Sequence, residues 1–590
     1  MQIKLSEFIA QYLVDIGVDA VFAVSGGASL HLIHAIGDNP EIKYITPHHE
    51  QAAAMAADGY ARTKKNTLGV AIATSGPGAT NLITGMCCSY YDSVPVLFLT
   101  GQVSTFRMAG ETGVRQIGFQ ETPIVEICQS ITKYAVTISD PQKILFELQK
   151  AVYIAKSGRP GPVLIDIPDN LQRTIIDTKN LVEFETPKSD NDNEKLKGRI
   201  TQSILELIAS AQKPVIVGGW GLHLSGEEKR FLEFAEALNI PIALTWGGAD
   251  LVSYQHPLYA GTFGSHGMRS ANFTIQNADL IISLGSRLDT KSTGTPVNSF
   301  SKGSKKIIVD IDNFELMKFE KFGLSVDLLV NDDLRNFFNY FNFKELKKFR
   351  KDYSGWNRSI QTWKSKSNEF DGKFRGLIPG LNPYSFIEKL SLSIKDDARI
   401  FVDTGCSIAW MMQAGKFNGQ SRIFHDFNNT AMGWALPAAI GSYFANSEGQ
   451  IICVVGDGSL MMTLYELATL KHHKIPIQIY VLNNSGYSMI KQTQDQWMDS
   501  KYYASSQEGG LSFPNYEALA KAFDLRYSEL CAEDSISNFL QDNETQYGPS
   551  ICNVIISDRA SVIPQVKFGY PNEDMEPLLP RDEFEQWLKY

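Results

Sequence analysis

Short runs of apolar residues recur along the chain, and stretches with helical periodicity separate them. The first runs occupy residues 20–24, 68–74, 94–100 and 162–167, the next 214–218, 280–284 and 306–311, and the last 451–455 and 475–482. Uninterrupted apolar runs are typical of strands buried on both faces of a sheet. Their alternation with helices indicates parallel sheets. The pattern therefore predicts an α/β protein built from three blocks.

Changes in composition suggest where these blocks end. The polar stretch 187–195 reads as a linker, and the charged, aromatic-bearing stretch 344–373 predicts a helix plus a connection. We expect domains at 1–182, 195–345 and 378–565, followed by a tail at 566–590 that wraps over another surface. An amphipathic pattern near the start predicts that the chain goes straight into a helix.

Composition narrows the range of partners. The 590 residues are 43% hydrophobic and 20% charged, with a net charge of −10 and no long Lys/Arg cluster, so nucleic acid and anionic membrane surfaces are not expected partners. The longest apolar runs, at about ten residues, are too short to span a bilayer, and the first residues do not resemble a signal peptide. Seven cysteines, mostly in apolar segments, fit reduced thiols. We expect a cytoplasmic protein.

The most specific signal combines two strand ends. The sequence Gly-Asp-Gly-Ser at 456–459 follows the run 451–455, and Asn483 and Asn484 end the run 475–482. Open α/β sheets bind ligands at this rim. Carboxylate and amide oxygens suit a hard cation such as Mg²⁺, which usually keeps a phosphate oxygen, and glycines let the backbone approach that phosphate. Taken separately, each motif indicates an ordinary turn rather than a functional site.

At this spacing the two motifs together resemble the diphosphate–metal motif of the thiamine diphosphate (ThDP) enzymes. The resemblance implies that Asp457 and Asn484 bind Mg²⁺ through their side chains and Gly486 through its backbone carbonyl. It also places the neighbouring residues at the cofactor: Gly456, Gly458, Ser459, Tyr487 and Met489.

A second segment, 48–62, opens with Glu50 and is rich in alanine. A glutamate in a first helical turn is favoured by the macrodipole, and alanine is a good helix former, so structure alone explains this pattern. The segment nevertheless resembles the activating-glutamate helix of the ThDP enzymes. In that family the glutamate is hydrogen-bonded to the cofactor's pyrimidine ring and helps the thiazolium lose its C2 proton. The resemblance therefore implies that Glu50 is catalytic.

Further segments of the first block match the family. Residues 25–27 and 74–81 follow strands and could be capped turns, but in the family they lie beside the cofactor, although proline is usual where Ser25 stands. Segments 101–103 and 119–121 match the reaction pocket of acetohydroxyacid synthases, and Lys133 matches a lysine near the substrate entrance, where an exposed solvating lysine is the alternative. The resemblance thus adds Gly26, Gly27, Ser75, Gly76, Pro77, Asn81 and Gln102 as cofactor-binding residues and Phe119, Gln120 and Lys133 as catalytic ones.

The resemblance covers essentially the whole chain and is to the acetohydroxyacid (acetolactate) synthase-like group. It implies three doubly wound parallel-sheet α/β domains: pyrimidine-binding, central and diphosphate-binding. It also implies active sites between two subunits, and hence a homodimer or homotetramer. Met432 matches the apolar residue that supports the bent form of ThDP, with ordinary core packing as the alternative, and the Thr430 carbonyl would accept from the 4′-amino group.

The central block contains glycine turns at 218–221, 261–267 and 285–289 and an acidic turn at 310–312. Each turn alone is common in doubly wound domains. Together they resemble the FAD-binding central domain of acetohydroxyacid synthases, where the flavin is largely structural because the net ligation needs no redox step. The resemblance implies FAD contacts from Gly219, His266, Arg287 and Asp310.

Two positions depart from the family pattern. Thr493 stands where a tryptophan contacts the second 2-ketoacid, with Trp497 four residues on, and Lys291 replaces an arginine that grips its carboxylate. Lysine offers a point charge rather than a planar fork. The resemblance implies ThDP- and Mg²⁺-dependent decarboxylation of a 2-ketoacid, with pyruvate the expected donor, and ligation of the two-carbon unit to a second carbonyl. Two alternatives stay open: acetyl-branch transfer to a nucleotide-activated ketosugar in surface polysaccharide synthesis, and a catalytically inactive ThDP-fold binding protein.

Overall fold

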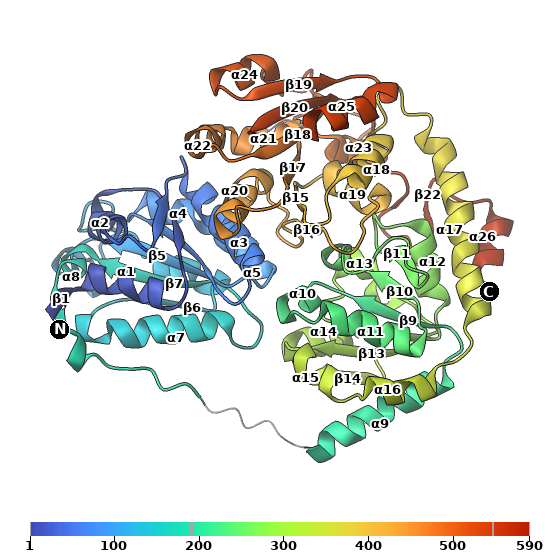
Figure 1. Ribbon diagram of the computed structural model, residues 1–590, viewed down its shortest axis with the longest axis horizontal. Helices are drawn as coiled ribbons and strands as arrows, with labels where there is room; N and C mark the ends of the chain where they lie inside the picture. Colours follow the sequence, from blue (N-terminus) through green and yellow to red (C-terminus); the bar gives the residue numbers. More distant parts are fainter. Residues whose placement is uncertain (1, 188–193, 545–547, 589–590) are drawn as a thin grey trace.

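The computed structural model describes residues 2–187, 194–544 and 548–588 and folds them around three six-stranded parallel sheets (Figure 1). The prediction of three doubly wound α/β domains is confirmed. Most of the predicted linker at 187–195 lies outside the described residues, and the exact domain limits stay predictions. Among the described residues, no helix combines the length and apolar character needed to cross a membrane.

The first sheet has the strand order β3-β2-β4-β5-β7-β6. Its strands are β2 (Ala20–Ala23), β3 (Lys43–Ile45), β4 (Gly69–Ala73), β5 (Val96–Gln102), β6 (Tyr134–Thr137) and β7 (Val163–Pro168). One face packs against α1 (Leu5–Asp15), α2 (Leu30–Asp38) and α7 (Ile144–Lys156). The other face packs against α3 (Glu50–Thr63), α5 (Ile83–Tyr91) and α6 (Ile124–Cys128).

The third sheet repeats this arrangement with the order β16-β15-β17-β18-β20-β19. Its strands are β15 (Arg399–Val402), β16 (Arg422–Phe424), β17 (Ile451–Gly456), β18 (Ile477–Asn483), β19 (Arg526–Leu530) and β20 (Ser550–Ile555). Its faces are covered by α18 (Pro383–Ser393), α19 (Cys406–Ala414) and α25 (Ile536–Glu544) on one side and α20 (Ala435–Ala445), α22 (Leu467–His473) and α24 (Tyr516–Ala522) on the other. Numbered within each domain, both sheets read 2-1-3-4-6-5.

The central sheet differs, with the order β11-β10-β9-β12-β13-β14. Its strands are β9 (Pro214–Gly218), β10 (Ile242–Leu244), β11 (Tyr259–Thr262), β12 (Leu280–Leu284), β13 (Lys305–Asp310) and β14 (Leu328–Asn331). Numbered within the domain, this is 3-2-1-4-5-6, the order of dinucleotide-binding sheets, whose ligands lie at the switch point between strands 1 and 4. Here the switch point lies between β9 and β12.

Helices α3 and α20 join the first and third domains and lie side by side (Figure 1). Their backbones approach so closely that a Cβ atom at Gly59 would lie 2.1 Å from the Ala438 carbonyl oxygen, and one at Gly441 would lie 1.8 Å from that of Ala56. Only glycine fits such an approach. The two equivalent helices of the twin domains therefore form the contact between them.

The start of the chain forms a strand that the sequence did not predict, and the tail packs on another surface as expected. The first described residues form β1 (Gln2–Lys4), which pairs antiparallel with β8 (Ile175–Asp177), so the chain does not go straight into α1 as expected. The tail packs on the central domain beside the long helix α17 (Ser354–Arg375) (Figure 1). Arg269 donates to the Met575 and Pro577 carbonyls, and Trp587 lies 4.9 Å from Phe273 between ring centroids.

Candidate active site

Asp457 lies at the carboxyl end of β17, at the switch point of the third sheet between β15 and β17. The Asp457 carboxylate is buried and accepts the backbone N–H groups of Gly458 (2.6 Å), Asn484 (3.1 Å) and Gly486 (3.2 Å). Burial raises the pKa of Asp457 to about 6, and these N–H groups act against that rise. The structure thus brings together the three predicted metal ligands.

The surrounding residues form a tight cradle around these ligands. The side-chain nitrogen of Asn484 donates to Ser488, which leaves the amide oxygen to act as a ligand. A Cβ atom at Gly458 would lie 2.0 Å from the Tyr487 ring, and one at Gly486 would lie 2.7 Å from the Ser505 carbonyl oxygen. Ser459 is buried at the start of α21 (Asp457–Met462), and Met489 packs on the core. This arrangement fits a hard cation and the phosphates it holds.

The loop that carries Thr430 and Met432 lies against α21. Gly433 donates to Asp403 at the end of β15, and its carbonyl accepts from Thr463 just after α21. Thr430 has a φ of 54°, an uncommon conformation for a β-branched residue. Its N–H donates to the Asp426 carbonyl, and the Ala431 N–H donates to the Asp426 carboxylate, so the loop holds this strained backbone in place.

Glu50 belongs to a second group of residues, at the equivalent switch point of the first sheet between β2 and β4. It is the first residue of α3, and its carboxylate accepts from the Asn81 side chain at 2.9 Å. A Cβ atom at Gly78 would lie 3.4 Å from the Glu50 Oε1 atom. Turns 25–29 and 74–78 meet here: Gly26 packs on Thr74, whose hydroxyl accepts the Ala28 N–H. The predicted residues Gly26, Gly27, Ser75, Gly76, Pro77 and Asn81 lie in these turns and in α4 (Pro77–Asn81).

The other predicted residues of the first domain have different surroundings. Gln120, with a φ of 64°, lies against Gly76, and the neighbouring Phe119 is 84% exposed. Gln102 is buried, and its amide nitrogen donates to Thr122 and Asp166. The Lys133 ammonium donates to the Ile154 and Ser157 carbonyls at the end of α7, and burial lowers its pKa to about 8, with Arg159 adding to the effect.

Among the described residues, the Glu50 and Asp457 carboxylates have different hydrogen-bond partners. The side-chain partner of Glu50 is Asn81 in the first domain, and the carboxylate partners of Asp457 all lie in the third. Several apolar side chains of segment 105–119 are exposed in the described chain: Phe106, Val114, Ile117 and Phe119. We refer to the Glu50 group and the Asp457 group as the two half-sites.

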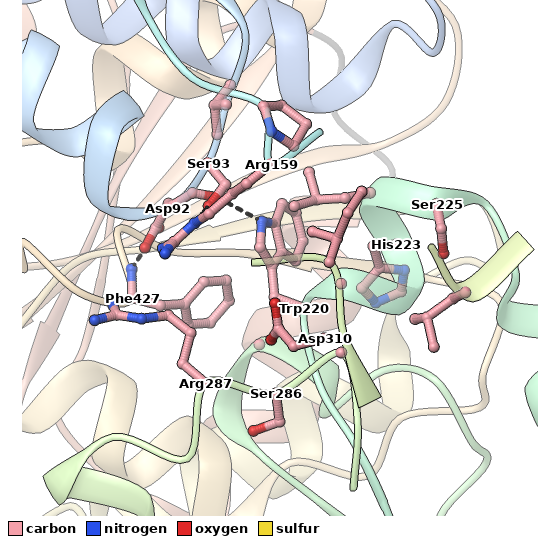
Figure 2. Close-up of a pocket in the computed structure, with 18 of the residues that line it drawn as sticks. Asp92, Ser93, Arg159, Trp220, His223, Ser225, Ser286, Arg287, Asp310 and Phe427 are labelled. Atoms are coloured by element: carbon pink, nitrogen blue, oxygen red, sulfur yellow. Dashed lines mark hydrogen bonds between the residues drawn. The ribbon is translucent and has the colours of Figure 1, made fainter. Parts of the chain in front are cut away.

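A cavity of about 470 Å³ lies where the three domains meet. Its walls include the turns after β9 and β12, and therefore the switch point of the central sheet. Figure 2 shows Trp220 between Asp92 and Ser93 on one side and Ser286 and Asp310 on the other. The Trp220 indole donates to the Asp92 carbonyl at 2.9 Å.

Charged side chains gather along this cavity. Arg159 bonds Asp312 (3.0 Å) and Glu315 (2.8 Å), and Arg287 bonds Glu315 (2.8 Å). Although burial acts to raise it, the cations Arg287, Lys318 and Arg159 hold the pKa of Glu315 at about 2. Burial raises the pKa of Asp310 to about 6. The cavity therefore offers cations together with an acid of raised pKa at a strand end.

Two of the four predicted flavin contacts, Arg287 and Asp310, line the cavity. Gly219 lies behind the wall, where a Cβ atom would meet the Gly285 carbonyl oxygen at 2.4 Å, and His266 packs behind Trp246 at 6.2 Å between ring centroids. Sequence reasoning missed three lining residues from different domains: Arg159, Trp220 and Phe427. Of these, only Trp220 lay within a glycine motif that could have drawn attention to it.

The two positions that depart from the family pattern lie in different domains: Lys291 lines the central cavity from α13 (Thr290–Thr293), and Thr493 lies in the third domain. The Lys291 ammonium lies 4.5 Å from the centre of the Trp246 ring, and burial lowers its pKa. Burial also lowers the pKa of His425, to about 3, and the charge of Lys291 adds to this effect. Thr493 is exposed on α23 (Ser488–Trp497), where its hydroxyl donates to the Met489 carbonyl. Trp497, 62% exposed, contacts Phe568 of the tail at 5.7 Å between ring centroids.

Comparison with known proteins agrees with this architecture. The chain matches three thiamine pyrophosphate enzyme families: the N-terminal TPP binding domain at residues 3–125, the central domain at 201–337 and the C-terminal TPP binding domain at 403–554. It is 32% identical to the acetolactate synthase large subunit of Lactococcus lactis over 582 residues, which cover 98% of this chain and 97% of that protein. It is also 32% identical to acetolactate synthase 2 of Nicotiana tabacum over 577 residues (97% and 85%) and 31% identical to acetolactate synthase 1 of Zea mays over 587 residues (97% and 88%). The chain therefore belongs to the acetolactate synthase-like family of ThDP-dependent enzymes.

Proposed function

We propose that this ThDP enzyme uses Mg²⁺ to decarboxylate pyruvate and ligates the resulting two-carbon unit to a second carbonyl compound, as an acetolactate synthase does. The observation that carries the proposal is the buried Asp457 carboxylate, with the Asn484 amide and the Gly486 backbone gathered around it at a sheet switch point. The printed names of the relatives support the reaction class.

The candidate site residues have the following proposed roles. Asp457, Asn484 and Gly486 would hold Mg²⁺, and the glycines around them would leave room for the diphosphate. When bound, ThDP supplies the carbon nucleophile and the electron sink of the reaction. Glu50 would hold a proton at the pyrimidine ring, with Asn81 fixing its carboxylate. Thr430 and Met432 would orient the ring. Phe119 and Gln120 would close the pocket. Lys133 directly precedes β6, at the opposite edge of the sheet from Glu50, so the role near the entrance expected from the sequence is not kept.

Two substitutions test the assignment. Glu50→Gln replaces the carboxylate with an amide of the same shape, so ThDP affinity should stay near that of the wild type. Turnover should fall by about 100-fold or more, because the group that holds the proton is removed. Asp457→Ala should instead weaken binding of Mg²⁺ and ThDP. ThDP affinity is measured by calorimetry, and turnover by CO₂ release from pyruvate. Full turnover of Glu50→Gln would contradict the assignment.

The residues around the central cavity fit FAD. Arg159 and Arg287 suit a diphosphate, and Asp310 at the end of β13 suits a ribose hydroxyl. Gly219 and Gly285 allow the turns after β9 and β12 to pack closely against each other. FAD would be a structural cofactor here, since ligation needs no net redox step. Purified protein that absorbs near 450 nm would support FAD binding, and colourless protein that takes up no added FAD would refute it.

The separate surroundings of the two half-sites and the exposed apolar side chains of segment 105–119 support an assembly in which Glu50 of one chain completes the Asp457 site of another. The proposed active unit is a homodimer, or a homotetramer built from such dimers. Mass photometry should find dimers or larger species at working concentrations. An active monomer would contradict the proposal.

A second acceptor class has support from two observations. The Lys291 ammonium lies over Trp246 and provides no planar fork, and Thr493 provides no aromatic wall. A ketosugar activated by a nucleotide is therefore a candidate acceptor beside a 2-ketoacid. Mass spectrometry of products from pyruvate alone, with 2-ketobutyrate and with nucleotide-linked ketosugars decides between them. Rapid acetolactate formation, with no product from any sugar, would exclude the sugar acceptor.

A further inference from the structure

Glu466 is a buried carboxylate in the third domain that contacts the first. It ends a short 3₁₀ turn (Leu464–Glu466) between α21 and α22 and is 1% exposed. One carboxylate oxygen accepts the His48 N–H at 2.9 Å, and the other accepts the Thr469 hydroxyl at 2.7 Å. Its contact across the domain boundary is thus with the backbone two residues before Glu50.

The neighbouring residues strengthen this contact. Tyr465 lies 5.8 Å from His49 between ring centroids, and the His49 side chain accepts the Gln51 N–H at 3.0 Å as the N-cap of α3. The charges of both Glu466 and Glu50 act to raise the pKa of Tyr465, which burial raises most, to about 12. Two consecutive residues of the third domain therefore contact the two residues that precede Glu50.

The amide of His48 precedes the first turn of α3, so its orientation affects where the helix begins. Glu50 is the first residue of that helix, and its side chain has a separate partner, Asn81. A carboxylate held by one side-chain hydrogen bond points in a defined direction only if its backbone is also fixed. Glu466 supplies a buried acceptor for this purpose.

We propose that Glu466 is a positioning residue that fixes the start of α3 through the His48 backbone and so directs the Glu50 carboxylate. The inference rests on the proposed role of Glu50. Burial raises the pKa of Glu466 to about 7, against the hydrogen bonds from Thr469, His48 and His49. Both protonation states keep an oxygen that can accept the His48 N–H, so this role requires an acceptor rather than a charge.

The requirement for an acceptor separates two variants. Glu466→Gln keeps a carbonyl oxygen at nearly the same position, whereas Glu466→Ala removes it. In cofactor-free protein, amide hydrogen exchange of a peptide spanning 46–53 should speed up at least tenfold in Glu466→Ala and stay within about twofold of the wild type in Glu466→Gln. Glu517→Ala, at an exposed position on α24, is the matched control and should change neither.

The effect of Glu466 on Glu50 is measured as the rate of proton exchange at C2 of bound ThDP. Deuterium exchange at its C2 atom, followed by NMR after acid quenching, should slow at least tenfold in Glu466→Ala and recover in Glu466→Gln, while the ThDP dissociation constant changes less than threefold. Wild-type exchange rates in Glu466→Ala, or equal loss in both variants, would overturn the inference. If the proposed role of Glu50 is wrong, Glu50→Gln would exchange the C2 proton at the wild-type rate. The amide exchange result for Glu466 does not depend on that role.

Discussion

The first and third domains have the same strand order and contact each other through the equivalent helices α3 and α20, yet they carry different functional side chains at equivalent positions. In each sheet the ligand-side residues follow the two strands at the switch point, β2 and β4 in one and β15 and β17 in the other. The first domain has small residues and turns there, with Glu50 opening α3. The third has Asp403 and Asp457, with Met432 shortly before the equivalent helix α20.

This comparison shows that the shared topology fixes where a ligand can lie, and that a few side chains decide which part of the ligand is bound. An acid that receives three N–H groups and has an amide oxygen beside it suits a metal and phosphates. A glutamate held by one asparagine suits exchange of a proton with a heterocycle. Two half-sites with complementary tasks are what one cofactor needs when it lies between two chains.

We expect the largest effect when the Glu50 half-site is mutated in one chain and the Asp457 half-site in another. Homo-oligomers of Glu50→Gln and of Asp457→Ala should each be nearly inactive. Co-expression with two different affinity tags should restore about 25% of wild-type sites, because statistical pairing gives half mixed dimers with one intact site each. The measurement is the activity of doubly purified mixed dimers, which should be about half that of the wild type because each has one intact site of two. Mixed dimers no more active than their parents would show that both half-sites act within one chain.

The next effect concerns the helix pair that joins the twin domains. Gly441→Ala places a methyl group where the Ala56 carbonyl oxygen lies 1.8 Å away, so it should destabilise the protein by about 3 kcal/mol. Gly372→Ala, in α17 with open space around the Cβ position, is the control and should be neutral or slightly stabilising. Thermal unfolding measures both. Equal unfolding temperatures would mean that α3 and α20 do not pack this closely.

Much of this architecture could be predicted from the sequence. Residues 214–218 and 280–284 form β9 and β12 with the predicted limits, since both runs are apolar and bounded by polar residues or glycine. Asp457 and Asn484 meet because they end neighbouring strands. Strand β1 was not predictable, because three residues carry no periodicity and their partner lies at 175–177.

The central cavity was only half predictable, for a related reason. Its glycine turns follow strands of one sheet and leave a local signal, which pointed to Arg287 and Asp310. Arg159 and Phe427 reach it from the two outer domains. Contacts between domains depend on tertiary packing and leave no spacing in a single sequence, which also explains why Glu466 did not stand out.

Asp310 of the central sheet differs from Asp457 in its hydrogen bonds, because it accepts the backbone N–H of Asp312, whereas Asp457 accepts three backbone N–H groups. The folded-state pKa of Asp310, about 6, is above the unfolded value of 3.8, so the folded state binds the proton more tightly. Stability is therefore lost as pH rises from about 4 to 6. In ligand-free protein, Asp310→Asn should gain about 3 kcal/mol over the wild type at pH 7 and almost nothing at pH 3.5. Urea unfolding at both pH values measures this; a gain independent of pH would contradict it.

The smallest expected effect concerns the acceptor side, where the chain departs from its family. Lys291→Arg would replace a point charge with a planar fork, and it should raise the use of a 2-ketoacid acceptor by about tenfold or less, or ~1.4 kcal/mol. Competition between 2-ketobutyrate and a ketosugar, analysed by mass spectrometry, gives the ratio. Lys416→Arg, at a lysine outside the central cavity, is the control. An unchanged product ratio would remove Lys291 from acceptor selection.

The most direct test of the central claim is release of labelled CO₂ from [1-¹³C]pyruvate. We expect the wild type to release CO₂ only with both ThDP and Mg²⁺ present, and Glu50→Gln to release it at least about 100-fold more slowly while ThDP stays bound. Undiminished release by Glu50→Gln, or none by the wild type with either a 2-ketoacid or a ketosugar as acceptor, would contradict this claim.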